Sequence, residues 1–185
     1  MNSNEMRIIA PQFKEVPDSI FSDHDTPIGR DLKQNLIDLL DKSSLSAEEA
    51  GLVLLAVSTS VGLDALAHYA RERVALLKIS LEQMQEAAES AALMAMLNVY
   101  YSFRRVIDDP QYGTPRLRMS VLMAPKVGQL RFDMIAFSLS VLNGCESCIQ
   151  GHEESLKEAG VSLEKVHDLA RLAAVVKGLA LLRMA

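Results

Sequence analysis

The amino-acid sequence predicts an all-α protein, and three observations support this prediction. Of its 185 residues, 49% are apolar but only 5% are aromatic, with nine methionines and no tryptophan. A mixture rich in leucine, alanine and methionine favours helices. Apolar residues also recur at spacings of three and four, the period of one helix face, and no segment alternates as a half-buried strand would.

The first 45 residues are expected to form a lead-in that contains one short amphipathic helix. Three of the six prolines fall within residues 1–27, where no regular period is found. From Ile28 to Leu40, apolar side chains return at helical spacing. We expect residues 46–185 to form an all-helical domain, so that the chain has a single domain overall.

Two capping boxes mark helix starts in this domain. Ser46 is followed three residues later by Glu49, and Ser80 is followed three residues later by Gln83. In this motif the two side chains satisfy backbone N–H groups that the first turn of a helix leaves unpaired. The helices expected in this half are 47–59, 63–77 and 81–103.

Residues 107–130 form the longest irregular region, because prolines and glycines accumulate there. One short helix is expected within it, near 117–123. Helical spacing then returns, and Asn143-Gly144 interrupts it as a turn signal. The helices expected after the irregular region are 131–142, 145–158 and 163–183.

An internal repeat relates the two helical halves. Residues 58–100 align with residues 140–182 at an offset of 82 without a gap, and Gly62 then falls on Gly144. The run Ser-Leu-Glu at 80–82 falls on the same run at 162–164. We infer two copies of one helical unit packed together.

A single turn, GCESCIQGH at 144–152, contains both cysteines of the chain. Cys145, Cys148 and His152 share one helical stripe, and thiols at a helix start are favoured as thiolates. The spacing of four lets His152 take or return the proton of Cys148. The two sulfurs are close enough to form a disulfide, so a dithiol cycle is available that could reduce a peroxide through a sulfenic acid. The aligned residues of the first copy, Leu63, Leu66 and Ala70, have no such chemistry.

Two other interpretations of this turn stay open. A zinc site would use Cys145, Cys148 and His152 with Asp133 or His167 as fourth ligand, although no second cysteine pair is present. Alternatively, the cysteines are incidental core residues beside a surface histidine. Histidines without a partner pattern are expected at the surface or in ordinary packing: His24, His68 and His167.

Net charge and hydropathy limit the possible partners. A formal net charge of -5 argues against nucleic acid and anionic membrane surfaces. No apolar run reaches the ~18 residues of a membrane span, and no secretory signal is visible. We therefore expect a soluble, cytoplasmic protein, in which a close cysteine pair is more often catalytic or metal-binding than structural.

The segment FDMIAFSLSVLNGCESCIQGHEESLKEAGVS resembles the signature region of the AhpD-type alkyl hydroperoxidases, in the carboxymuconolactone-decarboxylase-like superfamily. The resemblance extends through AALMAMLNVYYSFRR and PRLRM, and it covers the chain from about residue 45 to the end. The family motif is an acidic residue, eleven intervening residues, CxxC, three residues and histidine. In this sequence its positions are Asp133, Cys145, Cys148 and His152.

The resemblance implies an AhpD-like helical fold and a homotrimeric peroxidase with no bound cofactor. It also implies a dithiol reductant such as dihydrolipoamide, so that electrons pass from a lipoylated protein to a peroxiredoxin partner. By this resemblance, Cys148 forms the sulfenic acid, Cys145 resolves it and makes the mixed disulfide with the partner, and His152 and Asp133 relay protons. Because Cys145 stands at the helix entrance, we expect a partner's sulfur to reach it more easily than Cys148.

Two positions depart from the best-known family members. Asp133 replaces a glutamate, and Ser147 replaces a histidine between the cysteines. A serine cannot supply the same pKa-matched proton transfer. The main alternative is therefore a general dithiol-disulfide oxidoreductase or redox sensor with little peroxidase activity. A decarboxylase of the wider superfamily and a non-enzymatic helical interaction module are further alternatives.

Overall fold

The computed structural model describes residues 16–17, 20–21 and 25–184, and the regular elements in these ranges are all helical. The α-helices are α1 (Pro27–Lys42), α2 (Ala47–Ser60), α3 (Asp64–Leu76), α4 (Leu81–Ile107), α5 (Gln129–Asn143), α6 (Glu146–Glu158) and α7 (Leu163–Leu182). The all-α prediction is confirmed for these residues. Most of the irregular lead-in, including His24, lies outside them.

The helix starts follow the capping signals of the sequence. Both predicted capping boxes are present, one at the start of α2 and one at the start of α4. Helix α4 runs four residues beyond its predicted end at 103. Its last turn contains Arg104 and Arg105, which suit the negative end of the helix dipole, and Asp108 closes the helix in the left-handed conformation at φ 50°.

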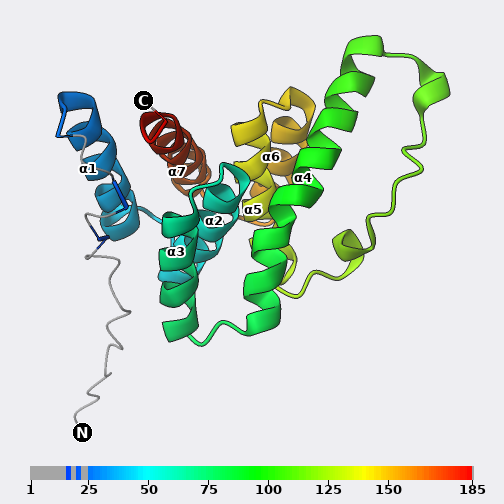
Figure 1. Ribbon diagram of the computed structural model, residues 1–185. Helices are drawn as coiled ribbons and strands as arrows, with labels where there is room; N and C mark the ends of the chain where they lie inside the picture. Colours follow the sequence, from blue (N-terminus) through cyan, green and yellow to red (C-terminus); the bar gives the residue numbers. More distant parts are fainter. Residues whose placement is uncertain (1–15, 18–19, 22–24, 185) are drawn as a thin grey trace, which may run out of the picture.

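The irregular region contains the short helix predicted near 117–123 and a second one that was not predicted. Two short 3₁₀ helices, η2 (Pro110–Tyr112) and η3 (Ser120–Met123), are present between α4 and α5. Aromatic contacts hold the first of them against α4: the rings of Phe103 and Tyr112 lie 5.2 Å apart, and the Tyr100 hydroxyl donates to the Tyr112 carbonyl at 3.3 Å. The segment then returns along α4 to the start of α5 (Figure 1).

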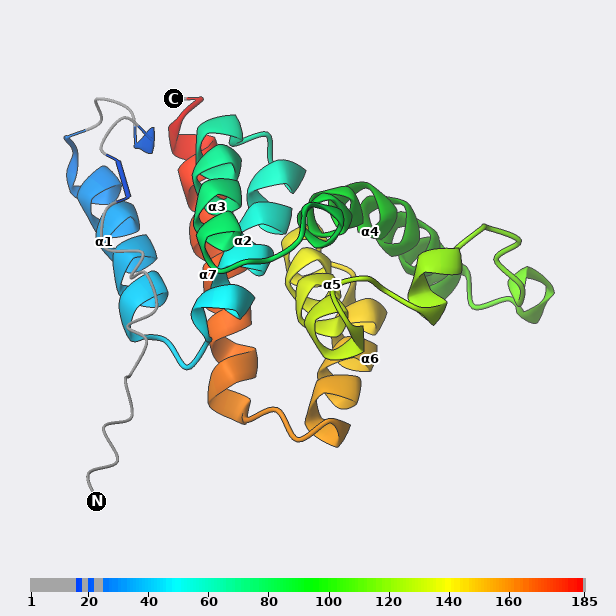
Figure 2. The same cartoon turned by 90° about the horizontal axis from the view of Figure 1, so that it is seen from below.

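Helices α2 and α5 pack against each other at the centre of the fold, with α7, α3 and α4 around them (Figures 1 and 2). Every residue of α2 from Ala50 to Ser58 is buried, and so is most of α5. Helix α1 covers α7 on one side, whereas α4 and α6 lie on the other side of α5. Within the described ranges, no helix is both long enough and apolar enough to span a membrane.

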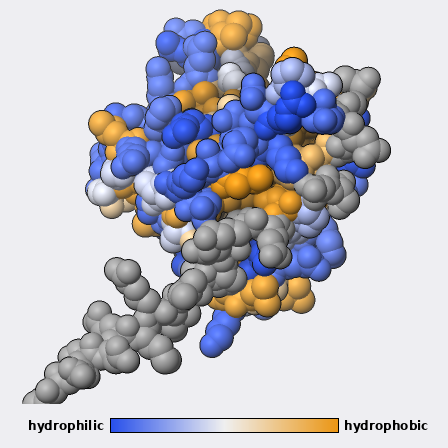
Figure 3. Space-filling view, turned by 90° about the vertical axis from the view of Figure 1, so that its left-hand side faces the viewer, coloured by the Kyte–Doolittle hydropathy of each residue, from blue (hydrophilic) through white to orange (hydrophobic). Residues whose placement is uncertain are grey.

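The surface is mostly polar but retains exposed apolar patches. On the face that carries α1, such patches lie among polar side chains (Figure 3). A second apolar surface follows the C-terminal half of α4. Its exposed residues are Met96, Val99, Phe103, Val106 and Ile107.

Candidate active site

The turn between α5 and α6 places the cysteines. Gly144 ends α5 in the left-handed conformation at φ 69°, which glycine adopts without steric cost. The backbone N–H of Cys145 then donates to the Ser140 carbonyl at 3.2 Å, and Cys145 becomes the N-cap of α6. The cysteine pair therefore stands at the start of a helix, as predicted.

The two cysteines form a disulfide, with their Cα atoms 5.3 Å apart. Their predicted ability to pair is thus confirmed. Cys145 is 0% exposed, whereas Cys148 is partly exposed and lines a cavity. The prediction that Cys145 is the more accessible sulfur is wrong. The Cys145 side chain faces the core. The aligned residue Leu63 is buried in the same way and is 5% exposed.

A histidine and a carboxylate from different helices meet in the same cavity. His152 Nδ1, on α6, lies 3.7 Å from Asp133 Oδ1, on α5, with side chains 24% and 19% exposed. This is an ion-pair distance, longer than a direct hydrogen bond. The other carboxylate oxygen accepts a hydrogen bond from Gln129 Nε2 at 3.3 Å. Gln129 was not among the predicted residues, although its spacing of four from Asp133 is a detectable helical pair signal.

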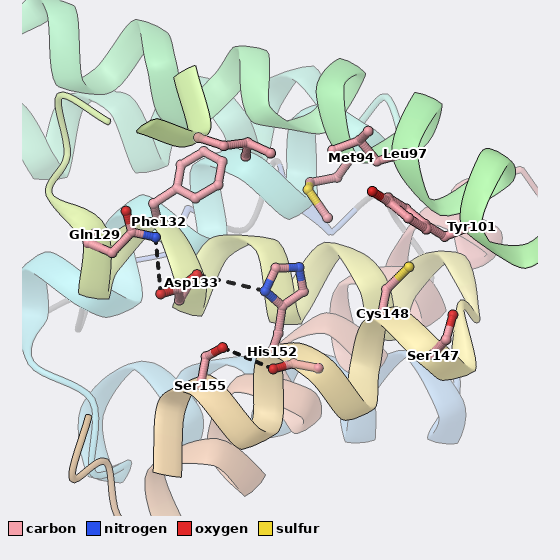
Figure 4. Close-up of a pocket in the computed structure, with 12 residues that line it drawn as sticks. Met94, Leu97, Tyr101, Gln129, Phe132, Asp133, Ser147, Cys148, His152 and Ser155 are labelled. Atoms are coloured by element: carbon pink, nitrogen blue, oxygen red, sulfur yellow. Dashed lines mark hydrogen bonds and ion pairs between the residues drawn. The ribbon is translucent and has the colours of Figure 1, made fainter. Parts of the chain in front are cut away.

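The cavity has a volume of about 420 Å³ and lies between α4 and the α5–α6 pair (Figure 4). Met94, Leu97 and Tyr101 of α4 form an apolar wall, and Leu122 and Phe132 add to it. The polar lining residues face them from α5 and α6: Gln129, Asp133, Ser147, His152 and Ser155. The sequence alone did not indicate the apolar wall, because its residues read as ordinary core positions of a long helix.

Ser147 faces the buried cysteine. Its hydroxyl oxygen lies 3.8 Å from Cys145 Sγ, a distance compatible with a weak hydrogen bond to sulfur. The same residue also lines the cavity. Although the Ser147 hydroxyl is no base, it can therefore donate a hydrogen bond to a thiolate at Cys145.

A buried amide connects α4 to the end of α5. Asn98, 2% exposed, donates from Nδ2 to Ser140 Oγ at 3.0 Å and accepts from Asn143 Nδ2 at 2.8 Å. Ser140 also supplies the carbonyl that receives the Cys145 N–H. Asn98 thus holds the cysteine turn at a defined position relative to the apolar wall.

The remaining predicted ligands and histidines lie elsewhere. His167 is exposed on α7, and His68 on α3 lies 3.3 Å from the Glu72 carboxylate. In the part of the chain that the structure describes, no group of three or more histidine, cysteine, aspartate or glutamate side chains is arranged to hold a metal ion.

Fold and site together define an all-helical protein with a cysteine-pair disulfide at a helix start and a histidine–carboxylate pair beside it. The family model for carboxymuconolactone decarboxylases matches residues 115–185. The chain is 36% identical over 150 residues to the alkyl hydroperoxide reductase AhpD of Anaeromyxobacter dehalogenans, covering 80% of each chain. It is 37% identical over 151 residues to that of Streptomyces coelicolor, covering 80% of this chain and 84% of the relative. The protein belongs to the AhpD-type alkyl hydroperoxidase family.

Proposed function

We propose that this protein is a thiol-dependent alkyl hydroperoxide reductase that uses the Cys145–Cys148 pair and a His152–Asp133 relay. The observation that carries the proposal is that Cys148, His152 and Asp133 line one cavity with an apolar wall. Such a cavity suits an organic hydroperoxide, since its hydrocarbon part can lie on the wall while its O–O group meets the sulfur. The names of the relatives support the same activity.

In the first half of the cycle, His152 takes the proton of the Cys148 thiol, and Asp133 stabilises the imidazolium. The thiolate attacks the peroxide: an S–O bond forms, the O–O bond breaks, and the leaving alkoxide receives the proton to become an alcohol. Cys148 is left as a sulfenic acid. The Cys145 thiol then gives up its proton and its sulfur attacks Cys148 Sγ; the disulfide forms, and the displaced hydroxide takes up the proton and leaves as water.

The second half of the cycle needs an external dithiol. By family resemblance, this is a dihydrolipoyl group on a lipoylated protein, and a peroxiredoxin receives electrons from the reduced site. No bound cofactor enters the scheme. The scheme requires the disulfide to be reopened, which fits a reducing compartment such as the cytoplasm.

Family resemblance also leads us to propose a homotrimer. The exposed apolar residues of α4, such as Val99 and Val106, supply a surface that a second copy can cover. Light scattering at micromolar concentration tests this proposal, and a monomer would contradict it.

Single-cysteine variants test the division of labour between the sulfurs. Cys148→Ser should abolish sulfenic acid formation, which a dimedone adduct detects by mass spectrometry. Cys145→Ser should still form the adduct on Cys148 but should not turn over with hydroperoxide and dihydrolipoamide. If Cys148→Ser traps a sulfenic acid on Cys145 at the wild-type rate, the assignment is reversed.

A general dithiol-disulfide oxidoreductase or redox sensor is the second candidate. Ser147 favours it, because no base stands between the cysteines to assist peroxide cleavage. Hydroperoxide consumption separates the two: this candidate predicts rapid disulfide exchange with dihydrolipoamide but negligible loss of hydroperoxide.

A further inference from the structure

We propose that a reducing thiol enters the oxidised site at Cys148 Sγ and expels Cys145 as a buried thiolate that Ser147 stabilises. The inference deepens the proposed dithiol cycle and rests on it. It places the contacts with the peroxide and with the reductant on one sulfur, Cys148 Sγ.

Access decides which sulfur is attacked. Thiol–disulfide exchange requires the incoming thiolate to reach a sulfur atom, and its rate depends on which sulfur is open. Cys145 is 0% exposed and is absent from the cavity lining, whereas Cys148 lines the cavity. Figure 4 shows Cys148 projecting from α6 toward Tyr101, on the same side as His152. An incoming thiol therefore meets Cys148 first.

The surroundings of Cys145 favour its departure as a thiolate. Cys145 is the N-cap of α6, where unpaired backbone N–H groups and the helix dipole favour negative charge. The Ser147 hydroxyl, 3.8 Å from Cys145 Sγ, can donate to that charge. A thiol with a lowered pKa is also the better leaving group in exchange.

Two successive thiol–disulfide exchanges reopen the Cys145–Cys148 bond. The reductant thiolate forms a bond to Cys148 Sγ while the Cys145–Cys148 bond breaks, and the bonding pair leaves on Cys145 Sγ. The second thiol of the dithiol, as thiolate, then attacks the reductant sulfur bound to Cys148. The reductant departs as a cyclic disulfide, and the Cys148 thiolate takes a proton through His152.

Trapping the mixed disulfide tests the entry point. The oxidised full-length protein is mixed with excess 2-mercaptoethanol, quenched with acid, denatured and alkylated with N-ethylmaleimide. Fragmentation mass spectrometry should locate mercaptoethanol on Cys148 and maleimide on Cys145, and the reverse pattern would overturn the inference. Because no hydroperoxide is present, loss of peroxidase activity would refute the proposed function without affecting this result.

Single-cysteine variants give a second measure of access. In folded protein, the Cys148 thiol of Cys145→Ser should react with Ellman's reagent at least about tenfold faster than the Cys145 thiol of Cys148→Ser. In denaturant the two rates should converge. Equal rates in folded variants, with circular dichroism unchanged, would contradict the burial argument.

Ser147→Ala tests the stabilisation of the leaving thiolate. We expect reduction of the disulfide to slow by about tenfold, the order expected from one lost hydrogen bond to a charged group. The pH dependence of Cys145 alkylation should also move to higher pH, and Ser147→Thr should restore both. Ser90→Ala is the matched control, because that hydroxyl donates to the Glu86 carbonyl and does not line the cavity. Unchanged kinetics and pH dependence in Ser147→Ala would refute this role.

Discussion

The α2–α3 turn and the α5–α6 turn have nearly the same backbone but different side chains. Gly62 and Gly144 both have φ 69°. In the first turn the Leu63 N–H donates to the Ser58 carbonyl at 3.0 Å, and in the second the Cys145 N–H donates to Ser140 at 3.2 Å. Backbone geometry alone therefore does not create the redox site.

The correspondence continues beyond the turns. Lys78 and Gly160, again 82 residues apart, both have positive φ, and they precede α4 and α7 respectively. Ser80 and Ser162 then cap those two helices. These pairs support the proposal that segments 58–100 and 140–182 are copies of one helical unit.

The side chains of the two aligned segments differ most where the cavity lies. Helix α3 buries Leu66, Tyr69, Ala70 and Val74, whereas α6 buries only Leu156. Tyr69 aligns with Gly151, which lines the cavity and has open space where a Cβ would point. The Tyr69 ring fills the core beneath α3, whereas Gly151 leaves open space in the cavity that Cys148 also lines.

The largest effect should come from His152, whose aligned residue in the first segment is Ala70. His152→Ala should slow hydroperoxide-dependent turnover by ~10²- to 10⁴-fold, because a general base is lost. Asp133→Asn should do less, since it acts through the imidazole. His68→Ala on α3, also a histidine near a carboxylate, is the control and should match wild type. A steady-state assay with hydroperoxide and dihydrolipoamide measures the turnover rate of all three variants. A wild-type rate for His152→Ala would contradict the proposed relay.

The buried serines that precede the two turns, Ser140 and Ser58, differ in hydrogen bonding, so mutations that affect them should change stability differently. Ser140 is bonded by Asn98, whereas Ser58 Oγ is buried without a hydrogen-bond partner. Asn98→Ala should lower the free energy of unfolding by about 1 to 3 kcal/mol, because it leaves buried polar groups unpaired. Ser58→Ala should be neutral or stabilising. Urea denaturation measures both, and an equal loss in the two variants would contradict the distinction.

Acid should weaken a contact that Asp168 makes on α7. Its carboxylate accepts the Ser44 N–H at 2.8 Å. Burial acts to raise the pKa of Asp168, but hydrogen bonds from the Ser44 backbone and hydroxyl and the charge of Arg171 outweigh it, so the pKa is lowered.

A lowered pKa in the folded state means that the ionised Asp168 stabilises the fold above its ordinary pKa of about 4. This contribution is lost as the pH falls through the lowered value. Asp168→Asn should therefore cost about 1 to 2 kcal/mol at pH 7 and progressively less below pH ~4. Chemical denaturation across pH measures it, with exposed Glu164→Gln on the same helix as control. A cost that does not change with pH would exclude the ionised carboxylate as its source.

The smallest effects are expected for two glycines, Gly62 in the α2–α3 turn and Gly151 in the cavity lining. Gly151→Ala should raise stability by about 0.4 to 1 kcal/mol, because the helix interior accepts alanine and the added Cβ meets nothing within 4 Å. Gly62→Ala should lower it, since φ 69° strains an L-residue. Thermal denaturation gives both signs. Destabilisation by Gly151→Ala would mean that the space beneath α6 is smaller than described.

Interactions between residues close in the sequence determined most of the secondary structure of this protein. Apolar spacing and the capping boxes at Ser46 and Ser80 predicted the helices, because both signals act within one or two turns. The Asn143-Gly144 break and the cysteine stripe are local in the same way. The disulfide between Cys145 and Cys148 needed only their spacing on one turn.

Tertiary structure decided which groups share the cavity and which face the core. Asp133 reaches His152 only because α5 and α6 pack side by side, and Tyr101 reaches the cavity only because α4 crosses them. Periodicity shows that a residue lies on a buried face, but it does not show whether the neighbouring helix fills the space opposite. For this reason the exposure of Cys145 was predicted wrongly from the sequence. The exposure of its sulfur depends on packing against other helices, which no local sequence pattern encodes.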